Sequence, residues 1–158
     1  MTGTRRPELF LDANILFSAA WKDDAAALLL FELAAGGFCT LVTSRLAREE
    51  ASSNLTIKRP ERLVVLKKLM ATLDLATEPG EKYLEKASRH GLPDKDIPIL
   101  AAALSSSASL LVTGDRRDFG HLYGKRIEGV EVVGLGTAIE RVIGTKQRSS
   151  QNSNLKKN

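Results

Sequence analysis

Short β-rich runs alternate along this chain with longer segments of helical spacing, and this alternation constrains the fold more than any other feature. Runs of strand character occur at 8–12, 38–43, 73–77, 110–113 and 130–133. Helices are expected over 24–35, 44–54, 60–73, 79–89, 97–106 and 135–142, and the stretch between the first strand and the first of these helices is expected to be a loop. The pattern predicts an α/β domain, a three-layer α/β/α sandwich with a mainly parallel central sheet.

The charge is unevenly distributed between a body and a tail. The 158 residues carry 23 Lys and Arg against 19 Asp and Glu, a formal net charge of +4, and the tail at 145–158 holds four basic residues and no acid. We therefore expect a formally neutral domain at 1–144 and a basic polar tail at 145–158 that is disordered. With Cys39 as the only cysteine, no apolar run of ~20 residues and no secretory signal, we expect a cytoplasmic protein without a disulfide or membrane span.

Acidic residues follow two of the predicted strands and lie on two helices that flank the same edge of the sheet. They are Asp12, Asp115, Asp94 with Asp96, and Glu49 with Glu50. Each one taken alone is equally well explained as a helix cap or as part of a solvated helix face. Taken together, clustered carboxylates repel one another unless a cation neutralises them. Oxygen donors without several cysteines or paired histidines favour Mg²⁺ or Mn²⁺ over zinc.

These four segments resemble the motifs of the PIN domain, a family of small metal-dependent ribonucleases that includes many toxins of toxin–antitoxin pairs. Asp12 and Asn14 in LFLDANILFSA match the first motif, and Glu50, with Glu49 as second choice, matches the glutamate of the second. Asp96 precedes the apolar helix of the third motif, and Asp115 lies in the V-T-x-D turn of the fourth. The resemblance extends over residues 9–142.

The resemblance implies a metal-dependent endoribonuclease that hydrolyses RNA phosphodiester bonds with Mg²⁺ or Mn²⁺. Asp12, Asp96 and Asp115 would hold the metal, and Glu50 would complete the site or orient the attacking water. Auxiliary roles would fall to Asn14, Thr113, Asp94 and Asp118. The partners that it implies are RNA, a cognate antitoxin protein and a second copy of the chain as a homodimer, with no membrane.

Basic residues near these acids are candidates for contacts with RNA phosphates. They are Arg45, Arg48, Lys58, Arg59, Arg116 and Arg117. The group from Arg59 to Lys68 can equally be a solvated helix face. Trp21 can stack on a base, anchor a partner or belong to the core or to a dimer interface.

Two other functions remain open for such a chain. One is a phosphatase or phosphotransfer domain of similar sheet class, which Asn14 disfavours because such enzymes usually carry a second Asp at that position. The other is a non-catalytic RNA-binding protein of PIN-like fold. Cleavage of single-stranded RNA that depends on a metal would separate the three functions.

Overall fold

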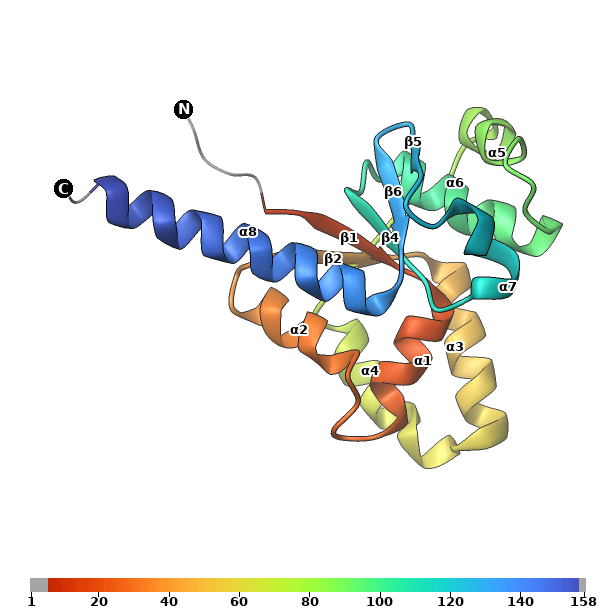
Figure 1. Ribbon diagram of the computed structural model, residues 1–158. Helices are drawn as coiled ribbons and strands as arrows, with labels where there is room; N and C mark the ends of the chain where they lie inside the picture. The colour runs from red at the N-terminus through yellow and green to blue at the C-terminus, as the bar shows by residue number, and fades with distance from the viewer. Residues whose placement is uncertain (1–5, 157–158) are drawn as a thin grey trace.

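A computed structural model describes residues 6–156, with side chains described as far as Thr145, and it is built around one six-stranded sheet (Figure 1). The strand order is β3-β2-β1-β4-β6-β5, and every pairing is parallel except that of β5 with β6. The strands are β1 (Glu8–Leu11), β2 (Thr40–Thr43), β3 (Asp74–Leu75), β4 (Leu110–Val112), β5 (Arg126–Ile127) and β6 (Val130–Val133). The predicted α/β class with a mainly parallel sheet is confirmed.

Helices flank the sheet on two sides, with α1 to α4 and α8 on one and α5 and α6 on the other (Figure 1). They are α1 (Ala13–Trp21), α2 (Leu28–Ala35), α3 (Arg45–Lys58), α4 (Leu63–Met70), α5 (Glu81–Ala87), α6 (Ile97–Ser105), α7 (Arg116–Phe119) and α8 (Leu135–Lys156). Short 3₁₀ turns lie at η1 (Pro60–Arg62), η2 (Asp94–Asp96) and η3 (Gly120–Leu122). Within the described residues, no helix combines the length and apolar character that crossing a bilayer requires.

The helix α1 differs from the sequence-based expectation, which placed a loop between β1 and residue 24. The backbone turns into a helix directly after β1, because the Asp12 carboxylate caps it by accepting a hydrogen bond from Ala13 N at 2.7 Å. Ile15, Leu16 and Ala19 then bury one side of the helix in the core, at a spacing that fits a helical turn. The expected loop is thus a capped amphipathic helix.

The last helix, α8, continues through residues 145–156, where the sequence analysis expected a disordered tail. The side chains beyond Thr145 lie outside the described part of the chain, so the division into a domain at 1–144 and a tail at 145–158 stays a prediction. The short strand β5 was also not predicted, whereas α7 agrees with the alternative interpretation of Asp115 as a helix cap.

The central strands β1 and β4 are buried on both faces, as parallel strands between two helical layers are. They pair in a register that sets Leu11 beside Val112. Asp12 and Thr113 are the next residues on each strand, so both reach the same carboxyl edge of the sheet. Strands β2 and β3 lie on one side of β1, and β4 and β6 lie on its other side, so the direction in which strands are added to the sheet reverses at β1. In sheets of this type, ligands bind at such a switch point.

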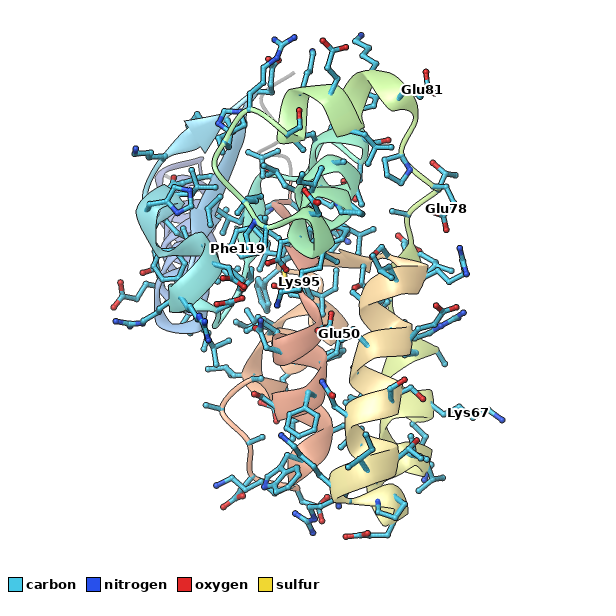
Figure 2. All side chains as sticks on the ribbon, turned by 90° about the vertical axis from the view of Figure 1, so that its right-hand side faces the viewer. Glu50, Lys67, Glu78, Glu81, Lys95 and Phe119 are labelled. Carbon is cyan, nitrogen blue, oxygen red and sulfur yellow. The ribbon has the colours of Figure 1, made fainter. Side chains whose placement is uncertain are left out.

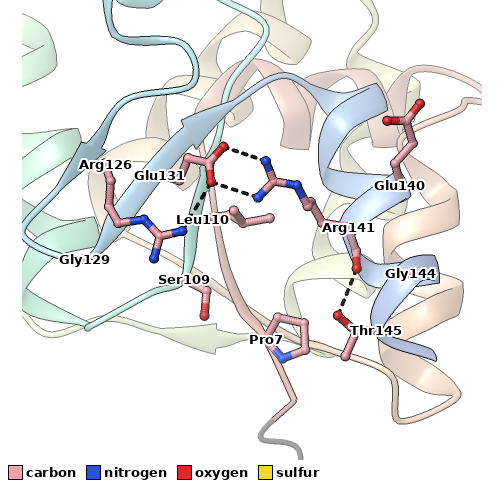
Figure 3. Close-up of a pocket in the computed structure, with 10 residues that line it drawn as sticks. All are labelled: Pro7, Ser109, Leu110, Arg126, Gly129, Glu131, Glu140, Arg141, Gly144 and Thr145. Atoms are coloured by element: carbon pink, nitrogen blue, oxygen red, sulfur yellow. Dashed lines mark hydrogen bonds and ion pairs between the residues drawn. The ribbon is translucent and has the colours of Figure 1, made fainter. Parts of the chain in front are cut away.

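The opposite, amino-terminal edge of the sheet holds a cavity of about 340 Å³ (Figure 3). Its buried acid, Glu131 on β6, accepts hydrogen bonds from both terminal nitrogens of Arg141 at 2.8 and 2.9 Å and pairs with Arg126 at 3.6 Å. The hydrogen bonds from Arg141 lower the pKa of Glu131. Both arginines thus pair with the same carboxylate, and the bonds from Arg141 fix α8 against β6.

Candidate active site

Asp12 is held at the carboxyl edge of the sheet by donors from both central strands. Its Oδ2 atom accepts a hydrogen bond from Thr113 Oγ1 at 2.8 Å and another from Asn14 Nδ2 at 3.2 Å. The side-chain oxygen Oδ1 of Asn14 accepts a hydrogen bond from Gly114 N at 2.6 Å. This bond joins the start of α1 to the turn after β4. Burial raises the pKa of Asp12 against the effect of the hydrogen bonds from Thr113 and Ala13, so its environment disfavours an uncompensated charge.

Three further carboxylates gather beside Asp12. Asp96, Asp115 and Asp118 each offer one oxygen atom, and these atoms lie within 4.8 Å of one another. Asp96 ends the turn η2, and Asp115 caps α7 by accepting a hydrogen bond from Asp118 N at 2.9 Å. Asp115 therefore both caps α7 and belongs to the group of clustered carboxylates. Asp118, which the sequence analysis expected only as an auxiliary residue, belongs to the same group.

Asp96 is the residue of this group that carries a buried oxygen atom without a hydrogen-bond partner among the described residues. It is 8% exposed, and its Oδ2 atom has no hydrogen-bond partner among the residues that the structure describes, since Lys95 Nζ at 3.9 Å is too far away. Burial and the neighbouring carboxylate of Asp118 raise the pKa of Asp96 to about 7. A buried acceptor of this kind requires either a proton or a cation.

The donor set fits a hard divalent cation. All the clustered donors are carboxylate oxygens, which suit Mg²⁺ and Mn²⁺, and the single cysteine, Cys39, is buried against Leu30 O instead. Asp12, Asp96 and Asp115 line one cavity of about 130 Å³, the acidic cavity. The unpartnered Oδ2 of Asp96 is the atom that such a cation would satisfy.

The helix α3 contributes Glu50 to the acidic cavity, and Glu49 turns away from it. Glu50, Asn54 and Lys58 line the cavity from one side of α3, at intervals of four residues. Glu49 instead accepts a hydrogen bond from Arg45 at 3.0 Å on the exposed side of the helix. Figure 2 shows Glu50 near the middle of the face that carries Lys95, with Lys67 pointing outward.

Lys95 is a member of the site that the sequence analysis did not single out. Its Nζ atom lies 3.2 Å from Asp118 Oδ2, and the side chain lines the acidic cavity. Asn54 and Phe17 line the same cavity and were also not named as site residues. The spacing of Asn54, midway between Glu50 and Lys58 on one helix face, is the signal that identifies it.

Several predicted site residues lie away from the acidic cavity. Asp94 is exposed at the start of η2 and does not line the cavity, so Asp96 alone occupies that position. Arg48 borders a different cavity, between α3 and α4. Arg116 and Arg117 are exposed on α7.

Two more of the predicted RNA-binding residues are engaged by other parts of the protein. Arg45 pairs with Glu49 and with Glu78. Arg59 donates to Trp21 O at 2.6 Å and contacts Glu61. Of the six basic candidates, only Lys58 lines the acidic cavity.

Comparisons with known proteins concern the fold and the family of the chain. No curated protein matches the chain by sequence. Among solved structures, PAE2754 from Pyrobaculum aerophilum is 21% identical with a TM-score of 0.62, and the match covers 90% of this chain and 99% of that one. A chain of VapBC2 from Rickettsia felis, bound to a DNA fragment from their promoter, is 17% identical with a TM-score of 0.59, covering 80% and 98%.

A chain of DNA-bound VapBC from Salmonella typhimurium is 18% identical with a TM-score of 0.60, covering 82% of this chain and 98% of that one. These identities are low, so the similarities establish a shared fold. A family model described as the PIN domain matches residues 8–117, which is more than half of the chain. The protein belongs to the PIN domain family.

Proposed function

We propose that the protein is a metal-dependent endoribonuclease that hydrolyses RNA phosphodiester bonds in the cytoplasm. The observation that carries the proposal is the buried Asp96 Oδ2, which has no hydrogen-bond partner in the described part of the chain and lies at a cavity lined by further carboxylates. This cavity lies at the switch point of a parallel sheet in a member of a family of nucleases.

In this proposal Asp96, Asp115 and Asp118 would hold a Mg²⁺ or Mn²⁺ ion, and Asp12 would complete its surroundings. Such an ion lowers the pKa of a bound water and neutralises charge that develops on a phosphate. Thr113 and Asn14 keep the Asp12 carboxylate in one orientation through their hydrogen bonds to Oδ2.

The remaining cavity residues act on the water and the phosphate. Glu50 faces the cavity from α3 and accepts a proton from the attacking water at its carboxylate. Lys58 and Lys95 present ammonium groups to the cavity, where they bind non-bridging phosphate oxygens without selecting a sequence.

We also propose that the nuclease is the toxin of a toxin–antitoxin pair and binds a cognate antitoxin protein. Membership of the PIN domain family, which includes many such toxins, and the fold shared with VapBC chains support this proposal. Expression of the chain alone in a bacterial host should arrest growth, and expression of an Asp12→Asn variant should not. Equal growth with both would contradict it.

The enzymatic proposal is tested with purified protein and a single-stranded RNA, in chelator and then with added Mg²⁺ or Mn²⁺. We expect cleavage only with the metal. The chain offers two matched pairs of variants: Asp96→Asn with Asp94→Asn as its control, and Glu50→Gln with Glu49→Gln as its control. The first member of each pair should lower kcat/KM by roughly 10²- to 10⁴-fold, and the control should retain activity.

Three outcomes would contradict the proposal. Cleavage that persists in chelator would exclude a metal-dependent reaction. Release of phosphate from phosphomonoesters without RNA cleavage would favour the phosphatase alternative. Binding of RNA without any reaction, in the presence of either metal, would favour a non-catalytic RNA-binding protein.

A further inference from the structure

Two aromatic side chains of α1 lie where the acidic cavity meets a second, apolar cavity. Phe17 and Trp21 are one helical turn apart, and their ring centroids are 5.2 Å apart with the planes tilted by 36°. Phe17 lines the acidic cavity, and both rings line the apolar cavity, which has a volume of about 440 Å³. A ligand in the apolar cavity therefore touches the same ring that borders the carboxylates.

The residues lining the apolar cavity suit a flat, uncharged group. Besides the two rings it is bordered by Leu135 and by alanines of the segment between α1 and α2. Among the described residues that line it there is no carboxylate, and Lys22, which pairs with Asp24 at 3.7 Å, is the one charged residue. The volume falls within the range of roughly 300–1,000 Å³ that small-molecule pockets occupy.

The end of α1 that carries Trp21 is held by two arginines that follow α3. Arg59 donates to Trp21 O and Arg62 donates to Ala20 O, each at 2.6 Å, so the last carbonyls of α1 are satisfied by fixed guanidinium groups. The Arg59 guanidinium also lies over the Trp21 ring, 4.9 Å from its centroid. A platform that is ordered before binding loses little entropy when a ligand stacks on it.

Lys58 supplies a charge between the rings and the acids. Its Nζ atom lies 5.5 Å from the centroid of the Phe17 ring, and its side chain borders the acidic cavity. Within the part of the chain that the structure describes, Lys58 forms no ion pair, in contrast to Arg59 and Arg62, which pair with Glu61 and Asp23. Its ammonium group is therefore available to a phosphate that lies beside the aromatic rings.

We propose that Phe17 and Trp21 form a stacking site for an unpaired nucleobase adjacent to the phosphate that is cleaved. The inference rests on the proposed ribonuclease function and adds a reason for a preference for single strands, because a base in a duplex cannot expose its face to the rings. A nucleic acid is favoured over a protein segment because the apolar cavity shares Phe17 with the acidic cavity and Lys58 lies between base and phosphate.

The test uses the full chain as an Asp12→Asn variant, so that RNA is bound without being cleaved. Trp21 is the only tryptophan, so intrinsic fluorescence reports on this ring alone. We expect a single-stranded oligoribonucleotide, with Mg²⁺ present, to quench the fluorescence. An oligonucleotide of equal length with abasic residues, which keeps the phosphates, should not. In the same background, Trp21→Leu should raise the Kd of labelled RNA about 5- to 150-fold, as expected for losing one stacked base.

A control substitution, Leu75→Ala, removes an exposed apolar side chain from the edge strand β3 and should leave the Kd unchanged. If abasic and base-bearing strands quench equally, or if Trp21→Leu binds RNA as tightly as its parent, the stacking site is wrong. The stacking site is also wrong if Trp21→Leu keeps its affinity for RNA but no longer binds a protein partner. In each case cleavage of RNA by the wild-type protein would show that the nuclease proposal stands. A wild-type protein that neither binds nor cleaves RNA would overturn both.

Discussion

The substitution Asp96→Asn should stabilise the metal-free protein at pH 8 and have little effect at pH 4. Asp96 is buried, no described residue forms a hydrogen bond with its Oδ2, and the pKa of the carboxyl is raised from 3.8 to about 7. The asparagine side chain has a similar shape and carries no charge, so it fits the same place at every pH. Its amide group can also donate to a neighbouring carboxylate.

The magnitude follows from the difference in proton binding between the folded and unfolded states. Between pH 3.8 and about 7 the unfolded chain has released the proton and the folded protein keeps it, so stability falls as the pH rises. Over this window the loss amounts to ~4 kcal/mol at 1.36 kcal/mol per pH unit. Because the side chain keeps 11% of its exposure and Lys95 lies nearby, we expect about half of this, ~2 kcal/mol.

The assay is urea unfolding of the wild-type protein and Asp96→Asn at pH 4 and pH 8, with a chelator present. Asp94→Asn, an exposed neighbour on the same turn, is the matched control and should follow the wild type. Addition of Mg²⁺ or Mn²⁺ at pH 8 should reverse the order, since only the wild type gains stability from the ion. An Asp96→Asn variant that is less stable than the wild type at pH 8 without metal would refute the reasoning.

Three further predictions concern the ion, the amino-terminal edge of the sheet and the core. Mn²⁺ at about 100 times its Kd should raise the Tm of the wild-type protein in thermal unfolding by about 5–10 °C and leave Asp96→Asn unchanged. Arg141→Met should lower the free energy of unfolding by ~2 kcal/mol at pH 7, because Glu131 keeps a buried charge without its main partner. The pKa of Glu131 is lowered by this pairing, so its contribution is present above pH 4.5 and the difference in stability should shrink as the pH falls below it. Leu111→Ala should cost ~3 kcal/mol in urea unfolding because the side chain is fully buried in β4.

The sheet could be predicted from the sequence because its central strands are buried on both faces and consist of uninterrupted apolar residues. Leu9–Leu11 and Leu110–Val112 carry this signal directly. The helix α1 was not predicted, since Asp12 and Asn14 are also typical of turns. The sequence does not show that Asp12 caps a helix through Ala13 N, or that Asn14 bonds to Thr113. The strand β5 is two residues long and carries no pattern of its own.

The choice between neighbouring acids depended on local geometry. On α3 the buried residues Ala47, Ala51 and Leu55 define one stripe, and Glu50 adjoins this stripe, so helical spacing alone favours Glu50 over Glu49. Between Asp94 and Asp96 no such rule applies. The 3₁₀ turn η2 buries only the second of them, and its geometry depends on the packing of α6.

The sequence was least informative about the partners of charged side chains. Lys95 stands between two acids in the sequence and gives no sign that its ammonium group approaches Asp118, which is distant along the chain. Arg59 and Arg62 belong to a basic stretch that is typical of a phosphate-binding surface. Their guanidinium groups instead donate hydrogen bonds to carbonyl oxygens at the end of α1. Such pairings arise only when the helices meet.

The hydrogen bond between Thr113 Oγ1 and Asp12 Oδ2 joins residues that are 101 positions apart, and it has a consequence for how the protein matures. Strands β1 and β4 can pair only after the intervening helices and β2 have been synthesised, and contacts of such separation form late. A nascent chain that ends before β4 holds Asp12 and Glu50 but lacks Thr113, which orients the Asp12 carboxylate. The acidic cavity, which Asp115 completes, therefore forms only after β4 and the turn behind it have left the ribosome, and a half-made chain does not assemble it.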